Sequence, residues 1–252
     1  MNKDQTAPSG REHSKIISRV AKGTLAPLGL FQKGSSRTWI DDRGWWIVVI
    51  EFQPSGFGKG SYLNVGAMWL WHEQDHFTFD FGNDVGCRIA SFVGYVDEKQ
   101  FTPEAIRLAY LAKDEVLKLR SKLVSIHDAA RYLPRKAARD DSAWTKLSAA
   151  IALGYVGKTF RARWLFKSIE RKKPVGDWEL RHQESARGFV ETLDRSDDFQ
   201  RCVKERIWRT RKLLKLPERT ELDIDRKDRP VLHRWKSRFT VLRAMIGASK
   251  QG

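Results

Sequence analysis

Residues 45–53 read WWIVVIEFQ and alternate in the manner of a β-strand. The large apolar side chains that this alternation places on one face are Trp46, Val48, Ile50 and Phe52. Glu51 and Gln53 fall on the other face, so we expect that face to be partly solvated. The segment therefore predicts a strand with one fully apolar face.

Three neighbouring segments have the same period of two, namely residues 36–41, 62–71 and 77–81. The chain turns between strands at Asp42-Arg43-Gly44, across residues 54–60 and at Gly82-Asn83-Asp84. Consecutive strands joined in this way form a meander, so we expect a small antiparallel sheet of about four strands.

The period changes beyond residue 100. Thr102-Pro103-Glu104 supplies an N-cap, a proline at the first helical position and an early acid. Apolar residues then recur every three or four positions, which predicts a long amphipathic helix that ends at Pro134. Further helices are expected over residues 142–153, 159–171, 183–216 and 230–246, with an interruption near Asp197 as an alternative.

The predicted fold class is α+β, with a small antiparallel sheet, one helix before it and a helical C-terminal part. The first helix is expected over residues 14–25, after a flexible tail over residues 1–13. The remaining division is an α+β sheet domain over residues 14–100 and a basic helical region over residues 101–252, packed on or beside the sheet.

The net charge of +16 is confined to the helical part. Residues 1–100 contain 11 Lys/Arg and 11 Asp/Glu, whereas residues 101–252 contain 36 and 20. Such an asymmetry indicates a polyanionic partner, either nucleic acid or an acidic protein. The alternative is a solvated cationic surface that only keeps the protein soluble.

One cationic face is predicted on the helix over residues 183–216. Its members are Arg201, Lys204, Trp208, Arg211, Lys212 and Lys215. The cations could neutralise phosphates while the indole stacks on a base. Further clusters are residues 171–173, residues 226–229, and Arg234, Trp235 and Arg238. The alternative is that these are ordinary solvated helix faces with both tryptophans in the core.

His72-Glu73-Gln74-Asp75-His76 matches H-E-x-x-H, the zinc metallopeptidase pattern. That chemistry needs a helix, because only helical spacing directs His72 and His76 toward one zinc ion while Glu73 activates the bound water. The flanking residues alternate as strands, so we expect a polar hairpin turn. A zinc site formed by these three residues is the alternative.

Residues 152–159, ALGYVGKT, fit a relaxed phosphate-loop pattern with Ala152 in place of glycine. A working loop follows a buried strand and opens a helix. Residues 144–153 have a helical pattern instead, so we interpret Lys158 as a solvated residue in the turn of a helical hairpin.

The two cysteines, Cys87 and Cys202, lie far apart, which argues against a disulfide framework or a zinc ribbon. No window approaches about 18 consecutive apolar residues, and the first residues lack the apolar stretch of a secretory signal. We therefore expect a cytoplasmic protein without membrane contact.

Several short segments resemble a bacterial domain of unknown function, catalogue number 4304. The matching residues are Leu28-Gly29-Leu30-Phe31-Gln32-Lys33-Gly34, Thr38-Trp39, Glu51-Phe52-Gln53, Tyr62-Leu63-Asn64-Val65-Gly66 and Cys87-Arg88-Ile89. The likeness covers roughly residues 14–135 and departs at Leu30, where the family tends toward phenylalanine, and in the Trp-rich segment 69–76. The resemblance implies a bacterial α+β fold with a small sheet and following helices, and it implies no activity.

The leading functional hypothesis is a non-enzymatic accessory protein that contacts a polyanion, with nucleic acid as the expected partner. We predict no catalytic residue, no resident metal and no cofactor. One alternative is a zinc metallohydrolase built on residues 72–76. The other is a protein-interaction module, such as an antitoxin or immunity partner, whose basic face meets an acidic protein.

Overall fold

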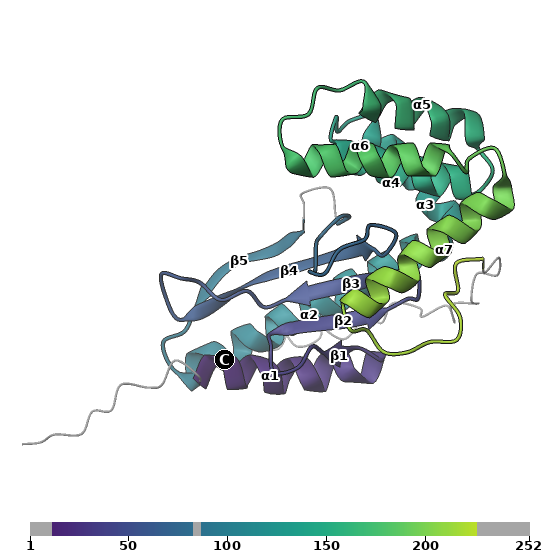
Figure 1. Ribbon diagram of the computed structural model, residues 1–252. Helices are drawn as coiled ribbons and strands as arrows, with labels where there is room; N and C mark the ends of the chain where they lie inside the picture. Colours follow the sequence, from purple (N-terminus) through teal and green to yellow (C-terminus); the bar gives the residue numbers. More distant parts are fainter. Residues whose placement is uncertain (1–11, 83–86, 226–252) are drawn as a thin grey trace, which may run out of the picture.

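The computed structural model describes residues 12–82 and 87–225 and has the predicted α+β class (Figure 1). Within these residues, one antiparallel sheet follows the order of the chain: β1 Phe31–Gln32, β2 Thr38–Asp42, β3 Trp46–Glu51, β4 Gly60–Trp69 and β5 Arg88–Gly94. Helix α1 (Glu12–Leu25) and the short 3-10 helix η1 (Ala26–Leu28) precede it. The predicted antiparallel meander is confirmed: three of the four predicted segments form β2, β3 and β4, and β1 and β5 are additional strands.

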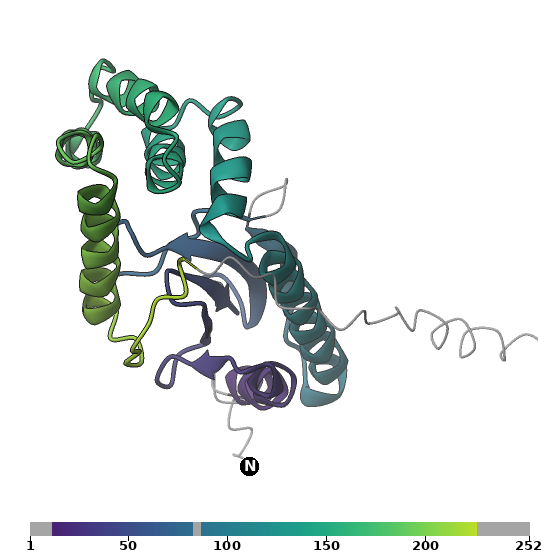
Figure 2. The same ribbon diagram turned by 90° about the vertical axis from the view of Figure 1, so that its right-hand side faces the viewer.

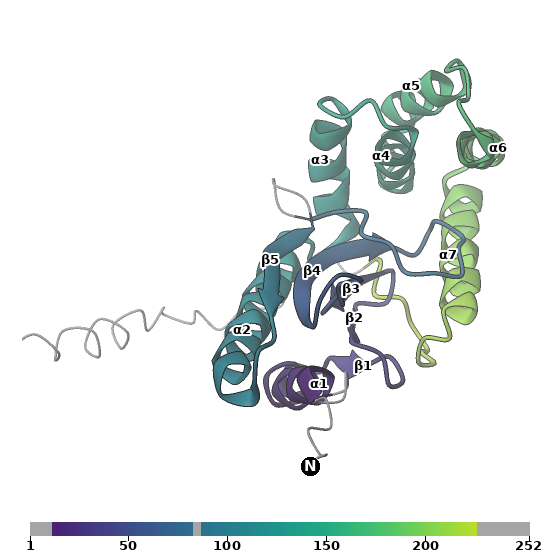
Figure 3. The same cartoon turned by 90° about the vertical axis from the view of Figure 1, so that its left-hand side faces the viewer.

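The described chain continues with α2 Glu98–Lys122, α3 Ile126–Ala137, α4 Ala143–Tyr155, α5 Thr159–Glu170, α6 Asp177–Val190 and α7 Ser196–Leu213. Helices α1 and α2 lie on one side of the sheet and α7 on the other (Figure 2). Helices α3 to α6 form a group beyond the sheet, and α7 runs from this group back to it (Figure 3). None of the helices in the described ranges is long and apolar enough to cross a bilayer.

Strands β3 and β4 are buried on both faces because helices and loops cover the sheet from both sides. On the face expected to be partly solvated, Glu51 and Gln53 are half-buried as predicted, whereas Ile47 and Val49 are as buried as Val48 and Ile50. Helix α2, in the predicted basic helical region, packs on the sheet. The buried apolar side chains of strands and helices therefore form one continuous core.

The strand predicted over residues 77–81 is not formed, and β5 takes the edge position beside β4 instead. Phe81 makes only an isolated bridge to Ala67. A side chain explains why no strand forms here. Asp80 Oδ2 accepts a hydrogen bond from the Trp69 backbone N–H at 2.7 Å, and this N–H would otherwise donate to the backbone of a neighbouring strand. Burial raises the pKa of Asp80 to about 6, although this and other hydrogen bonds lower it.

The helix predicted to end at Pro134 is in fact two helices. The chain breaks after Lys122 and restarts at Ile126, where Ser125 and Asp128 form a capping box. Pro134 lies inside α3 and does not end it.

Two of the other predicted helical segments agree with the structure. The helical hairpin predicted over residues 142–171 is confirmed as α4 and α5. The helix predicted over residues 183–216 is divided into α6 and α7, which confirms the alternative of an interruption near Asp197. The predicted helix over 230–246 and the clusters beyond residue 225 lie outside the described residues, as does most of the predicted tail.

Two adjacent carboxylates at the end of β2 connect the sheet to helices on its two sides. Asp41 is buried and accepts hydrogen bonds from Arg120 Nε and Nη2 at 2.8 and 2.7 Å. Arg120 lies in the last turn of α2 and also donates to the Leu28 carbonyl oxygen at 2.8 Å. Since successive side chains of a strand point to opposite faces, Asp42 is directed away from α2.

Asp42 binds Arg211 of α7 in the same bidentate manner. Arg211 Nη1 and Nη2 donate to the two carboxylate oxygens at 2.8 and 2.7 Å. The same guanidinium donates to the carbonyl oxygens of Gly44 at 3.0 Å and Pro217 at 2.8 Å. The Arg211 side chain is only 3% exposed, so its charge is compensated inside the protein. The two neighbours in β2 thus hold α2 on one face and α7 on the other.

The turn between β2 and β3 is also where the chain returns after α7. Leu222 and Ile224 are buried in the core. Gly44 has φ +84°, and a Cβ at this position would lie 2.1 Å from the Leu222 carbonyl oxygen. Glycine is therefore required here both for its backbone conformation and for the close approach of the returning segment.

Gly44→Ala is expected to destabilise the protein more than Gly29→Ala. Both glycines have φ +84°, so each alanine costs about 1–2 kcal/mol for the left-handed conformation. Only at Gly44 would the added methyl group meet backbone atoms of another segment, because a Cβ at Gly29 would have no non-neighbouring atom within 4 Å. We therefore expect a further loss of about 1–3 kcal/mol at Gly44. Urea denaturation measures both, and equal losses would contradict the packing of Leu222 on this turn.

Candidate functional site

The predicted cationic face lies on α7 and just beyond its end, and Arg211 corrects the prediction. Arg211 is buried and bound to Asp42, so it cannot contact a phosphate without releasing α7 from the sheet. Helical spacing places Arg211 on one face with the other cations, but spacing alone does not show which side of a helix faces the core.

The other members of the face are partly neutralised. Arg201 pairs with Asp198, and Lys204 Nζ lies 2.6 Å from Asp225. Trp208 is 37% exposed. Lys212 and Lys215 are exposed and have no acidic partner among the described residues. Two such lysines beside a half-buried indole make a weak polyanion site.

The H-E-x-x-H segment is not helical, as expected, but it lies in an irregular loop and not in a hairpin turn, because the strand predicted over residues 77–81 is not formed. His72 is buried, with Nε2 2.7 Å from Ser148 Oγ. Ser148 donates its hydroxyl proton to the Trp144 carbonyl oxygen at 3.0 Å, so His72 is the donor to Ser148 and carries its proton on Nε2. Burial, helped by His182 and Arg206, holds the pKa of His72 well below its usual value, and the ring is neutral.

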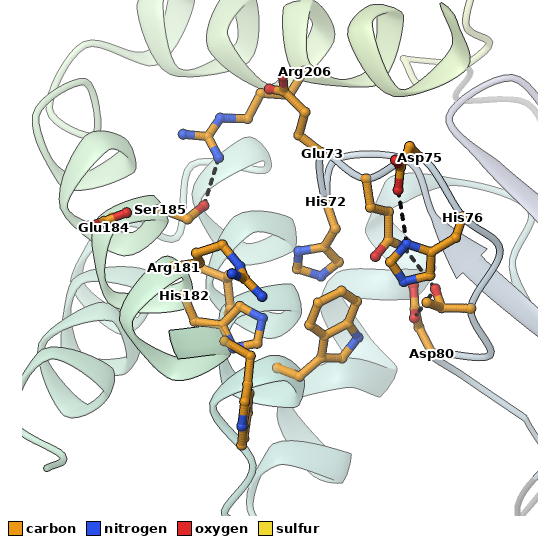
Figure 4. A pocket seen from close by; sticks show the side chains of 15 residues that line it. His72, Glu73, Asp75, His76, Asp80, Arg181, His182, Glu184, Ser185 and Arg206 are labelled. Carbon is orange, nitrogen blue, oxygen red and sulfur yellow. Dashed lines mark hydrogen bonds and ion pairs between the residues drawn. The ribbon is translucent and has the colours of Figure 1, made fainter. Parts of the chain in front are cut away.

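The remaining residues of the motif do not converge with His72. Glu73 pairs with Arg209 of α7 at 3.2 Å. His76 Nδ1 lies 3.1 Å from the Asp75 carboxylate at an exposed position (Figure 4). In the ranges 12–82 and 87–225, no three His, Cys, Asp or Glu side chains are grouped as metal ligands. Residues 72–76 therefore lack the helical geometry that zinc peptidase chemistry requires.

The phosphate-loop match also falls in a different structural context from the one its chemistry needs. Residues 152–159 contain the end of α4, a short turn and the first residue of α5. A helix precedes the turn where a phosphate loop needs a buried strand. The interpretation as the turn of a helical hairpin is confirmed.

A pocket of about 860 Å³ lies where the loop over residues 72–80 meets α4, α6 and α7 (Figure 4). Four rings follow one another in its wall: His72 stacks on Trp144 at 4.1 Å between centroids, Trp144 meets His182 edge-on at 4.9 Å, and His182 meets Trp178 at 5.5 Å. Trp178 is 48% exposed. The row of rings therefore runs from the core toward solvent.

Two arginines of this pocket have no acidic partner among the described residues. Arg206 Nη1 donates to Ser185 Oγ at 2.6 Å, and its guanidinium lies 4.1 Å from the Phe189 ring centroid, so the side chain is fixed in place. Arg181 is exposed on α6, one helical turn before Ser185. Burial, followed by the charge of Arg181, lowers the pKa of His182, so both histidines of the wall are neutral.

A second concave surface, of about 950 Å³, lies between α3, α4 and α5, and we call it the α3–α5 groove. Its apolar lining includes Ala130, Pro134, Ala137, Leu153 and Leu165. Phe160 and Trp164 also line it and are 83% and 65% exposed. They are four residues apart on α5 and so share one helix face.

The α3–α5 groove is rich in cations, which are Arg131, Arg135, Lys146 and Arg161. Arg131 pairs with Asp128, and Lys146 with Asp141. Arg135 and Arg161 have no acidic partner in the part of the chain that the structure describes. The groove thus combines these two guanidiniums with exposed rings, which the face on α7 does not.

Sequence reasoning missed both concave sites. The signal for the α3–α5 groove was present, because Phe160-Arg161-Ala162-Arg163-Trp164 places two rings four residues apart with arginines between them. The pocket in Figure 4 could not be read in this way, since its wall combines a loop and three helices that are distant in sequence.

Comparison with protein-family models, curated proteins and solved structures gives no match for this chain. The resemblance to the bacterial domain of unknown function therefore stays a prediction, and the functional argument depends on the geometry of the two sites.

The neutral state of His72 makes stability depend on pH. The pKa of His72 in the folded protein lies well below 6.5, the value for the unfolded chain. As the pH falls through 6.5, the imidazole therefore takes up a proton in the unfolded chain but not in the folded protein. Stability is then lost below this pH, by up to about 1.4 kcal/mol per pH unit. Asp80 acts in the opposite direction, because its raised pKa favours the folded state at lower pH.

His72→Gln is expected to reduce the loss of unfolding free energy between about pH 7 and pH 5, since glutamine does not titrate. The control is His127→Gln, which replaces an exposed histidine on α3. Urea denaturation at both pH values should give similar losses for the control and the unchanged protein and a smaller loss for His72→Gln. The same loss in all three would contradict a buried neutral imidazole.

Proposed function

We propose that this protein is a non-enzymatic accessory protein that binds single-stranded nucleic acid through the α3–α5 groove. The observation that carries the proposal is the pair of exposed rings, Phe160 and Trp164, beside the guanidiniums of Arg135 and Arg161. Proteins that bind single strands without sequence preference combine a cationic groove along the backbone with rings on which bases stack.

The exposed rings support a single strand over a duplex. In a duplex the base faces are already stacked, so an aromatic side chain finds no free face there. Stacking is worth about 1–3 kcal/mol per base, whichever base it is. Large exposed rings that share one side of a helix with cations are therefore suited to unpaired bases.

The charge of the helical group adds a longer-range attraction. Residues 126–213 contain 21 Lys/Arg and 12 Asp/Glu. Excess positive charge of this kind raises association rates with polyanions and makes binding salt-dependent. An acidic protein, as in the antitoxin or immunity hypothesis, would be attracted by the same charge. It has no bases, so binding it would involve no base stacking on Trp164.

The test is binding of a fluorescent oligonucleotide of about 20 nucleotides, measured by anisotropy across a salt series. Arg135→Glu with Arg161→Glu should weaken binding and reduce the slope of log K against log salt by about 1.4, or 0.7 for each phosphate that is no longer neutralised. Trp164→Ala should weaken binding about tenfold and leave the slope unchanged, because stacking releases no counterion.

The matched control is Lys212→Glu with Lys215→Glu, which makes the same change in net charge on the face of α7. Its affinity should fall less than that of the groove variant. Equal losses in the two charge-reversal variants, or no retention of the oligonucleotide at low salt, would contradict binding in the α3–α5 groove. If Trp164→Ala binds the oligonucleotide as tightly as the unchanged protein does, the contact is purely electrostatic, of the kind that an acidic protein could also make.

A further inference from the structure

We propose that the pocket in Figure 4 binds a nucleoside monophosphate. This site is separate from the α3–α5 groove, since the two share no lining residue. The proposal therefore does not depend on nucleic-acid binding. Its volume of about 860 Å³ falls within the range of about 300–1,000 Å³ that is usual for small-molecule sites.

The phosphate would be held by Arg181 and Arg206. Arg206 uses one of its five N–H donors on Ser185 and is packed on Phe189, so the remaining donors are already oriented. Arg181, on the neighbouring helix α6, lines the same pocket, and its guanidinium lies near the rings of His72 and His182 (Figure 4). A phosphate monoester carries a charge of about −1.5 to −2 at neutral pH, which two guanidiniums match.

The base would stack at the solvent end of the row of rings. Trp178 is 48% exposed, whereas Trp144 is already stacked on His72, so Trp178 offers the free ring face. His182 lies beside it, buried, with Nδ1 unpartnered among the described residues. Neutral imidazoles can donate or accept at the edge of a base, and they add no charge that would compete for phosphate.

The carboxylates of the pocket limit the charge that the ligand can carry. Glu73 and Asp75 are paired with Arg209 and His76. Glu184 also lines the pocket and has no basic partner among the described residues, so it suits a ribose hydroxyl. A second and third phosphate would meet these acids. The pocket is therefore expected to prefer a monophosphate over a triphosphate.

Isothermal titration calorimetry of the full chain with AMP, GMP, CMP and UMP tests the proposal, with inorganic phosphate, adenosine and ATP as comparators. At least one monophosphate should bind with a Kd below about 1 mM, and inorganic phosphate and the nucleoside should each bind at least about tenfold more weakly. Arg181→Gln with Arg206→Gln, and separately Trp178→Ala, should each weaken binding about tenfold or more.

The control is Arg187→Gln, which removes an exposed arginine from the same helix but outside the pocket, and it should leave the Kd unchanged. Trp164→Ala in the groove should also leave it unchanged, which separates this site from the proposed function. The proposal is overturned if no monophosphate binds, if inorganic phosphate binds as tightly as a nucleotide, or if the Arg181 and Arg206 variant binds as tightly as the control.

Discussion

The arrangement of the molecule depends on two neighbouring carboxylates in β2. Asp41 and Asp42 point to opposite faces of the sheet, and each binds one arginine through both of its oxygens. Arg120 brings the end of α2 to one face, and Arg211 brings the end of α7 to the other. The strand alternation that defines a β-sheet thus also positions the helices. Breaking either pair would leave a buried charge without its partner, which is far more costly than losing a surface ion pair.

This constraint also decides which cations can bind a ligand. Arg211 is buried and bound to Asp42, and Arg201 and Lys204 are matched by acids, so the regular spacing on α7 does not make a continuous phosphate-binding face. Arg161 in the α3–α5 groove and Arg206, which lines the pocket of Figure 4 from α7, have no acidic partner among the described residues. Net charge alone does not show which of these cations an anionic ligand could contact.

The sequence predicted the α+β class, the antiparallel meander and most helices, because these depend on local periodicity and turn residues. It failed at residues 77–81, where Asp80 takes the backbone N–H of Trp69 and prevents a strand. It also missed the break at Ser125, although the capping box with Asp128 was there to be read. The concave sites could not be derived, because they are formed by elements brought together only by tertiary packing.

A double-mutant cycle on Asp42 and Arg211 tests this central constraint most directly. The free energy of unfolding would be measured by urea denaturation for Asp42→Ala, Arg211→Ala and the double variant. Each single change should cost about 3–5 kcal/mol, because it leaves a buried charge unpaired. The double variant should lose about 1.5–3 kcal/mol less than the two single losses added together. Additive losses, with no coupling between the two residues, would contradict the role of this pair in holding α7 on the sheet.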